Sequence, residues 1–502
     1  MGDLNLAIDL HNKNEFEKAE PLYLKHLEEN PNDANANNLI GLLYSQTKQF
    51  DKSEKYLKKA VELDENINYI ENLAVCYYMQ KRYQEAMPYF EKILEKVPKD
   101  LARIRDFAKL AKDANQWEYA INFYSRSYEI DKRDHIALNN IGLGYEELKQ
   151  FDKAKGYYER SIRLKPNYHA FHNLGVWYRR AGNPKQSIVY LKRALTLNPN
   201  NKDTAVSLGM SYLAIKDIEN GQKYYRYRLP NIKNEWDGEK HPDKKLFIYA
   251  DGGRGDQLMF CRYIPFLKDY FKEIKFSVYD ELKEIFQQNY IDINIEAKSE
   301  KDIFEPHDYM VNPIDLPQKL GMNFDSIPYA QGYLKADEQK AEKYKKEFFD
   351  NNKVKVGIFW QGNLKVFPYR SMKLAEMSKL FELTNCQFYS CQKGDGIEQL
   401  KDYNNIIDLG STFNDYTDTA AALKNLDILV TIDSSILHLA GAMGVKTYLL
   451  LPVASEWRWF EDTKTTPWYD SVEIFKQEKL YDWQPPVDKV FSRLNELSDK
   501  QN

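Results

Sequence analysis

The sequence predicts a helical repeat solenoid followed by an α/β region made of two halves with a crevice between them. Over the first 230 residues, a small residue recurs every 33 or 34 positions, a period typical of a solenoid. From residue 246 onward, short apolar runs alternate with helical patterns, as they do in parallel α/β folds. At 502 residues the chain is too long for one ordinary domain, so we expect several compact units.

In the first region, four kinds of residue recur at fixed positions of the repeat. A glycine such as Gly41 lies twelve residues before the small residue, and a tyrosine such as Tyr44 follows the glycine by three; a proline such as Pro31 lies twelve residues after the small residue. We expect each repeat to be a pair of antiparallel helices, in which the small residues permit close approach and the proline ends the second helix. Val75 and Ala108 are expected to replace the glycine in two repeats. The small residues that define the period are Ala19, Ser53, Ala86, Ala120, Ala154, Ser187 and Gly221.

Stacked helix pairs form a groove that fits an extended peptide or a partner helix. The asparagines on first helices that are predicted to line this groove are Asn37, Asn38, Asn72, Asn139, Asn140 and Asn173. Their carboxamides can bond the backbone of a peptide without reading its sequence. The alternative is that these side chains are merely solvated.

The second region begins after a charged connector at residues 230–245. A strand at residues 246–250 leads through a turn with Gly252, Gly253 and Gly255 into a helix. These glycines are explained either by a tight turn or by the close approach of a ligand. A new strand after residue 350 opens a second series of strands and helices. The predicted domains are therefore the solenoid at 1–232 and two α/β halves at 233–350 and 351–502.

The segment 427–451 reads as a buried strand, a polar turn, a short helix and a second buried strand. Asp433, Ser434 and Ser435 end the first strand and are residues that cap helices. At the carboxyl end of a parallel strand, free backbone N–H groups and the helix dipole can hold a phosphate. His438, one turn into the helix, can point back toward the same crevice. The alternative is a plain helix cap with a satisfied core histidine.

Both regions resemble known families. The repeats look like the tetratricopeptide repeat, and the second region resembles glycosyltransferases of the two-Rossmann-domain (GT-B) type. The relatives by resemblance are bacterial proteins that fuse tetratricopeptide repeats to such a domain, the heptosyltransferases and, more distantly, the O-linked N-acetylglucosamine transferases. The blocks that carry the likeness are GRGDQLMFCRYIPFL, PHDYMVNPIDLP, VGIFWQGN with RSMKL, FYSCQKGDGIEQL, TIDSSILHLAGAMGVKTYLLLP and SEWRWFEDTKTTPWYDSVEIFKQ.

The resemblance implies a site for a nucleotide-sugar donor in the second half. The implied donor-binding residues are Gln361, Lys365, Arg370, Lys393, Asp433, Ser434, Ser435 and His438. A departing nucleoside diphosphate gains negative charge that a fixed cation or a helix end must stabilise. Lys365, Arg370 and Lys393 are the candidates for that cation.

The resemblance also implies a general base in the first half. Asp256, in GRGDQ, resembles the aspartate proposed as the base of the heptosyltransferases. A carboxylate beside the acceptor hydroxyl would make that hydroxyl a better nucleophile. The alternative is that Asp256 caps a helix beginning at Gln257, in which case Asp251 and His307 are the next candidates. The implied acceptor-side loop residues are Gly253, Arg254, Gly255 and His307.

The resemblance thus implies an inverting glycosyltransferase whose acceptor is a protein held by the repeats. No Asp-x-Asp pair ends a strand in the second half, so we expect neither a metal nor a cofactor beyond the nucleotide-sugar substrate. An inactive repeat scaffold, or a transferase for a saccharide or lipid acceptor, are the alternatives. The donor, the acceptor and the oligomeric state stay open. Trp457, Trp459 and Trp468 are expected to pack at a domain interface rather than to stack on a nucleobase.

Composition sets modest bounds on partners and location. With 71 Lys and Arg against 75 Asp and Glu, the formal charge of −4 gives no reason to expect nucleic acid as a partner. No apolar run reaches the roughly 18 residues of a membrane helix, and the first residues lack the apolar core of a signal peptide. We therefore expect a cytoplasmic protein without a membrane span. The 4 cysteines are scattered, as reduced thiols are, and Cys386 and Cys391 are expected to pack in strands.

Overall fold

The computed structural model describes residues 3–229, 234–249, 252–299, 307–324, 327–364, 368–460 and 464–499. Its internal contacts divide the chain into two compact units, Met1–Leu174 and Gly175–Asn502. The domain boundaries at 232 and 350 stay predictions.

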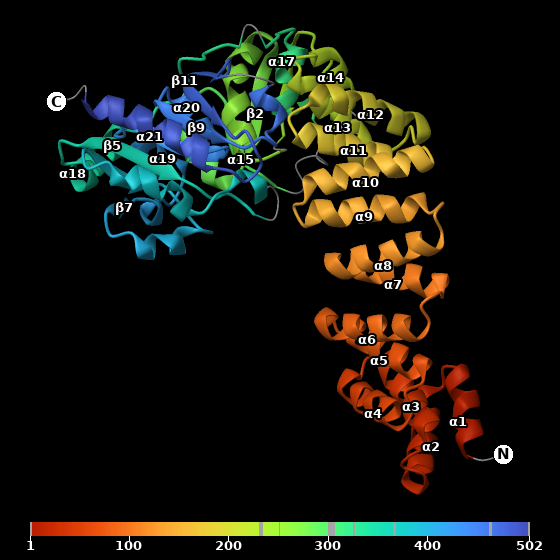
Figure 1. Ribbon diagram of the computed structural model, residues 1–502. Coiled ribbons are helices and arrows are strands. Elements are labelled where there is room, and N and C mark those ends of the chain that lie inside the picture. Colours follow the sequence, from red (N-terminus) through yellow and green to blue (C-terminus); the bar gives the residue numbers. More distant parts are fainter. Residues whose placement is uncertain are drawn as a thin grey trace. The chain divides into compact units, whose positions relative to one another are not determined.

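Helix pairs fill the fully described stretch from Asp3 to Tyr225. The first helices are α1 (Asp3–Asn12), α3 (Ala34–Gln46), α5 (Ile67–Met79), α7 (Leu101–Asp113), α9 (His135–Glu147), α11 (Tyr168–Arg180) and α13 (Lys202–Ala214). The second helices are α2 (Phe16–Glu29), α4 (Phe50–Leu63), α6 (Tyr83–Lys96), α8 (Trp117–Ile130), α10 (Phe151–Leu164), α12 (Pro184–Leu197) and α14 (Ile218–Tyr225). Within the first unit, α1 to α10 follow one another as antiparallel pairs (Figure 1). The predicted repeat of helix pairs is confirmed.

Local signals recur in these pairs with the period of the repeat. Asp33 caps α3 by accepting a hydrogen bond of 3.0 Å from the Ala36 N–H. The same kind of cap occurs at Asn66, Asp100, Asp134, Asn167 and Asn201. Between the two helices of each pair, one residue has a left-handed backbone; these residues are Asn14, Lys48, Lys81, Asn115, Lys149, Gly182 and Lys216. Each helix pair is therefore specified by its own short segment of sequence.

The marked positions of the repeat pack as expected, with one correction. The Ser53 hydroxyl donates to the Gly41 carbonyl at 2.8 Å, which fastens the two helices of a pair together. Tyr44 stacks on Tyr56 with ring centroids 5.8 Å apart. Equivalent pairs are Tyr77–Tyr89, Tyr145–Tyr157, Tyr178–Tyr190 and Tyr212–Tyr224. The prediction that Val75 takes the glycine position is wrong: Ala74 is fully buried, whereas Val75 is 37% exposed, because this repeat is spaced by 33 rather than 34 residues.

The first parallel sheet of the second unit has the strand order β3-β2-β1-β4. Its strands are β1 (His241–Ile248), β2 (Phe271–Val278), β3 (Asn294–Ala297) and β4 (Tyr309–Val311). The helices of this part are α15 (Arg254–Phe260), α16 (Lys283–Asn289) and α17 (Leu316–Lys319). The glycine-rich turn between β1 and α15 therefore lies at the carboxyl end of the first strand, as the sequence predicted.

The second sheet has the order β10-β11-β9-β8-β5-β6-β7, and all its neighbours except β10 and β11 pair in parallel. The strands are β5 (Val354–Phe359), β6 (Cys386–Ser390), β7 (Ile406–Asp408), β8 (Ile428–Ile432), β9 (Thr447–Leu451), β10 (Thr465–Thr466) and β11 (Tyr469–Lys476). The helices are α18 (Glu338–Phe348), α19 (Tyr416–Leu423), α20 (Ser435–Ala442) and α21 (Gln484–Asp499). Without β10, this is the strand order of a doubly wound sheet. The chain adds strands on one side of β5 first and then on the other side, beginning with β8, so the strand order reverses between β5 and β8.

Short 3-10 segments join these elements, including η2 (Cys261–Asp269), η6 (Pro368–Arg370), η7 (Leu374–Glu382) and η10 (Trp457–Trp459). The terminal helix α21 packs against η7, β9 and β11 of the second sheet. Val487, Val490 and Leu494 of the helix are fully buried in the core on that side of the second sheet.

One hydrophobic core joins α15 and η2 to α20 and β11. The guanidinium of Arg262 is fully buried in it and donates to the carbonyls of Trp468 at 2.8 Å and Met259 at 2.9 Å. Trp457, Trp459 and Trp468 are 3% exposed or less and belong to the same core, so these tryptophans pack as expected. All four cysteines are buried free thiols.

Candidate functional site

The predicted anion-binding turn lies between β8 and α20. Ser434 is the N-cap residue, but its side chain does not cap the helix; its hydroxyl donates to the Ile432 carbonyl at 3.2 Å. Ser435 accepts a hydrogen bond of 2.6 Å from the Tyr416 hydroxyl. Because the Ser434 side chain does not bond the N–H groups in the first turn of α20, these groups can bond another acceptor, such as a phosphate.

His438 is 4% exposed and makes contacts on several sides. Its Nδ1 lies 2.9 Å from the Tyr469 hydroxyl, and its ring stacks on Trp459 with centroids 5.7 Å apart. Burial, with the nearby charge of Arg458, lowers the pKa of His438 to about 3, so the ring is neutral at ordinary pH. These contacts match the alternative of a satisfied core histidine. A donor-binding role for His438 stays a prediction.

Asp256 uses both of its carboxylate oxygens. Oδ2 accepts a hydrogen bond of 2.8 Å from the Gly253 N–H, and Oδ1 accepts one from the Arg458 guanidinium. The helix therefore begins at Arg254 rather than at Gln257, and Asp256 caps it from within the first turn. The capping role is present, together with an ion pair that sequence reasoning did not foresee. Its role as a base stays a prediction.

The glycines of the β1–α15 turn bring two helices together. Gly252 has a φ of +79°, a left-handed conformation that makes the turn tight. At Gly255, a Cβ atom would lie 2.7 Å from Cδ2 of His438, so only glycine lets α15 approach α20 this closely. The approach of a protein helix, and not only of a ligand, therefore explains Gly255. As a result, Asp256 and His438 lie in the same site.

Arg458 connects two carboxylates in this site. Beyond Asp256, its Nη1 lies 3.5 Å from Oε2 of Glu456. The three side chains are largely buried, at 14% exposure for Asp256 and 11% for Arg458 and Glu456. Burial raises the pKa of Glu456, although the charges of Arg458 and Arg179 oppose the shift. We call Asp256, Arg458 and Glu456 the charged centre.

The candidate cations for a diphosphate differ in their surroundings. At the end of η6, Arg370 lies beside the loop after β5, because a Cβ atom at Gly362 would be 3.6 Å from its Nε; its charge also lowers the pKa of His438. Lys393 instead donates to the carbonyls of Phe413 and Asn414. Lys365 lies outside the described residues. Gln361 accepts a hydrogen bond of 3.1 Å from Gln399, so its side chain supports the loop after β5.

The acceptor-side residues are only partly brought together. Arg254 donates to Glu281 at 2.6 Å and lies over the Tyr279 ring, at the start of α15. The His307 ring stacks on the Phe247 ring with centroids 4.1 Å apart. His307 therefore lies against strand β1 and not at the start of α15. Asp251 lies outside the described residues.

The asparagines on first helices form links between repeats. Asn72 donates to Asn38 at 2.8 Å, and Asn173 donates to Asn139 at 3.0 Å. Asn37 is 3% exposed and donates to the Asp33 carbonyl at 2.8 Å, so it supports its own helix rather than lining a groove. The carboxamides are therefore not merely solvated.

Sequence reasoning missed Arg458, Glu456 and Arg262. The first two stand in SEWRWF, where charged residues alternate with tryptophans. Charges embedded in an aromatic segment are a usable signal, because burial of the rings forces the neighbouring charges to find partners. Arg262 gave a similar signal in the apolar run FCRYIPF.

Comparison with known proteins identifies the repeats. Models of the tetratricopeptide repeat match residues 32–99, 135–168 and 169–201. The first 200 or so residues therefore contain tetratricopeptide repeats, followed by an α/β region with parallel sheets.

Among whole proteins, the chain is 22% identical over 384 residues to Protein FlbA of Caulobacter vibrioides, a match that covers 67% of this chain and 63% of that protein. The chain thus spans under two thirds of the length of this relative. Among solved structures, YrrB, described as a tetratricopeptide-repeat protein with an unusual peptide-binding site, is 22% identical with a TM-score of 0.29, covering 36% of this chain and 95% of its own. The C-terminal part of a repeat protein from Cytophaga hutchinsonii is 16% identical with a TM-score of 0.35, covering 45% and 93%. These low scores carry no argument about function.

Two kinds of feature are absent from the part of the chain that the structure describes. No group of three or more His, Cys, Asp or Glu side chains is arranged there to hold a metal ion. No described helix is long and apolar enough to cross a membrane.

Proposed function

We propose that this chain is a glycosyltransferase of the GT-B type that moves a sugar from a nucleotide-sugar donor to an acceptor protein recruited by the repeats. The observation that carries the proposal is the charged centre where α15 and α20 meet. It combines buried carboxylates, a buried guanidinium and the start of a helix at the carboxyl end of β8. Such groups are what a reaction that releases a nucleoside diphosphate requires.

The topology of the second sheet supports a nucleotide site at the same place. In doubly wound sheets, ligands bind outside the carboxyl ends of the strands where the strand order reverses. Here that point lies between β5 and β8, followed by Gln361 and by Asp433. Arg370 and the first turn of α20 are our candidates for holding the diphosphate, because the charge of Arg370 acts on His438 and α20 begins two residues after Asp433.

The repeats support a protein as the acceptor. Tetratricopeptide repeats offer an extended surface of first helices on which a polypeptide can lie. Asn72 and Asn173, which are partly exposed and bonded to the buried Asn38 and Asn139, are our candidates among the carboxamides for bonding a peptide backbone.

An inactive scaffold is the second candidate, and one observation favours it. Both oxygens of Asp256 already have partners, as they would in a purely structural cap and ion pair. A scaffold would use the repeats for binding and would leave the α/β region without turnover.

Co-expression tests the proposal and separates the two candidates. The chain is expressed in a host together with candidate partner proteins that it captures, and the partners are analysed by intact mass spectrometry. A transferase should add mass in whole sugar increments, and Arg458→Met should abolish the addition while still capturing the partner. Capture without any added mass by the parent chain would favour the scaffold.

A further inference from the structure

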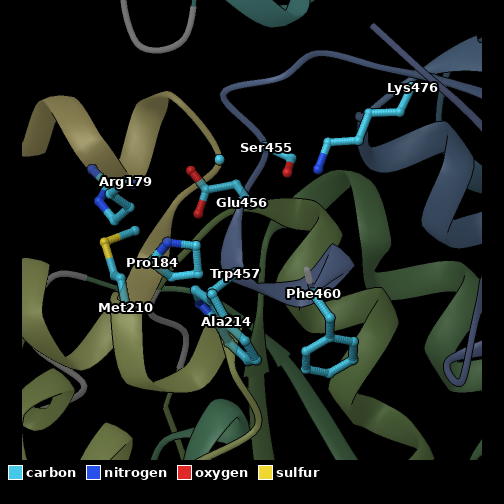
Figure 2. A pocket seen from close by; sticks show the side chains of 10 residues that line it. Arg179, Pro184, Met210, Ala214, Ser455, Glu456, Trp457, Phe460 and Lys476 are labelled. Atoms are coloured by element: carbon cyan, nitrogen blue, oxygen red, sulfur yellow. The ribbon is translucent and has the colours of Figure 1, made fainter. Parts of the chain in front are cut away.

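A small pocket opens beside Glu456 within the Gly175–Asn502 unit. Helices α11 and α13 of the repeats contribute Arg179 and Met210 to its wall, and the segment after β9 contributes Glu456 and Trp457. Figure 2 shows the Glu456 side chain between Arg179 on one side and Lys476 on the other. The pocket therefore lies where first helices of the last repeats meet the carboxyl edge of the second sheet.

The two carboxylates of the charged centre are not equivalent. Asp256 gives one oxygen to the Gly253 N–H and the other to the Arg458 guanidinium. The closest ionic contact of Glu456, to Nη1 of Arg458, measures 3.5 Å. Charge-assisted hydrogen bonds are about 2.7–2.9 Å long, so this contact holds the Glu456 carboxylate only loosely. Of the two, Glu456 has the oxygens better placed to accept a proton from a bound molecule.

The surroundings of Glu456 also suit a base. Burial raises its pKa, and a carboxylate with a raised pKa takes up a proton more readily. The charged and titratable groups around it are Arg458, Arg179, Asp433, Asp256, Tyr225, Tyr369 and Lys476. Arg458 joins Glu456 to Asp256, Gly255 beside Asp256 packs against His438, and Nε2 of His438 lies 3.8 Å from Oδ1 of Asp433, so the pocket and the predicted donor turn are neighbours.

We propose that Glu456, rather than Asp256, is the general base and that its pocket receives the acceptor hydroxyl, with Arg179 of the repeats as part of the wall. The inference rests on the proposed glycosyl transfer. In that step the acceptor oxygen bonds to the anomeric carbon, and the bond from that carbon to the diphosphate breaks. The electron pair leaves with the nucleoside diphosphate, and the acceptor proton moves to the Glu456 carboxylate. Asp256 then serves to position Arg458 and to cap α15.

Arg179 gives the inference a directional test. Its positive charge favours the ionised form of Glu456, so Arg179→Ala should raise the pKa of that carboxyl. A general base must be ionised, and activity is therefore lost as pH falls through its pKa. The acid limb of the pH–rate profile should consequently move to higher pH in Arg179→Ala. Lys192→Ala, on α12 and beside Tyr212, is the matched control that should leave the limb in place.

The decisive experiment compares Glu456→Gln with Asp256→Asn in the full chain. Release of nucleoside diphosphate from UDP-, GDP- and dTDP-linked sugars, with water as acceptor, is measured across pH. Glu456→Gln should lower kcat about 10²–10⁴-fold, leave the KM for the donor unchanged and remove the acid limb. Asp256→Asn should lose less and keep the limb. In Glu456→Ala, formate should restore part of the rate by supplying a base, which a structural role would not allow.

Controls keep the possible failures apart. Glu478→Gln, at a side chain 76% exposed, should behave like the parent. Circular dichroism and the melting temperature must show that Glu456→Gln is folded, and Glu456→Asp provides a second variant with the charge retained. An active parent whose Glu456→Gln variant keeps the rate and the acid limb would overturn this inference alone. A folded parent that turns over no donor would overturn the proposed function and the inference with it.

Discussion

The repeats and the charged centre use charged residues in opposite ways. On the repeats, ion pairs such as Arg82 with Glu85 are exposed to solvent, with 36% and 49% of the side chains accessible. In the charged centre, Arg458 and its two carboxylates are largely buried, with 11% to 14% of each side chain accessible. Exposed pairs contribute little to stability, whereas a buried charge without its partner is strongly destabilising. Removal of one residue should therefore have little effect in the repeats and a large effect in the centre.

Deletion of the first repeats should have the largest effect on transfer. A chain lacking residues 1–167 keeps α11 to α14. The second compact unit begins at Gly175, within α11, and contains α12 to α14 together with the α/β region. We expect transfer to a protein to be abolished, while slow donor hydrolysis persists, because the proposed function assigns acceptor capture to the repeats and bond cleavage to the α/β region. Mass spectrometry of the acceptor and chromatography of the released nucleotide measure the two activities. Undiminished protein transfer by the shortened chain would instead indicate a small acceptor.

Loss of Arg458 should have the next largest effect. Arg458→Met leaves Asp256 and Glu456 buried without their shared cation, which should lower the free energy of unfolding by about 3–5 kcal/mol. Urea unfolding followed by tryptophan fluorescence reports on this region, because Trp457 and Trp459 flank the residue.

Lys18→Met in the repeats is the control, and its effect on the unfolding midpoint should be small, since the Lys18–Glu15 pair that it breaks is exposed. Equal destabilisation by the two substitutions would contradict the contrast between the two regions.

His438 should make stability depend on pH. The pKa of His438 is about 3 in the folded chain, whereas a histidine exposed to water, as in the unfolded chain, has a pKa of 6.5. Below pH 6.5 the unfolded chain therefore binds a proton that the folded chain does not. The free energy of unfolding should therefore fall as pH falls, by about 2 kcal/mol between about pH 7 and about pH 5. His438→Gln should lose that part of the slope in urea unfolding measured at several pH values. A slope that His438→Gln leaves unchanged would show that the histidine is not buried in its neutral form.

A chelator should have no effect. The predicted donor site relies on a helix start and a cation such as Arg370 rather than on a metal ion. Donor hydrolysis should thus proceed at the same rate with and without EDTA. Loss of turnover that magnesium or manganese restores would show that the diphosphate is held through a metal.

The same contrast explains what the sequence could predict. The repeat was predictable because each helix pair has its own cap, turn residue and packing residues, such as Asp33, Lys48 and Ser53, within one period. The turn at Asp433 was predictable because capping chemistry follows a buried strand directly. The pairing of Asp256 with Arg458 was not, because 202 positions separate the two residues and no local pattern joins them. This pair forms because α15 and η10 belong to one hydrophobic core, which brings Asp256 and Arg458 together.

Donor turnover by the purified chain tests the central claim most directly. The full chain is incubated with UDP-, GDP- and dTDP-linked sugars, and the released nucleoside diphosphate is quantified by chromatography beside folded Glu456→Gln and Arg458→Met. The proposed function predicts release from at least one donor by the parent and a loss of about 10²-fold or more in Glu456→Gln. No release from any donor by a folded parent, or equal release by all three chains, would contradict the claim that the charged centre is an active site.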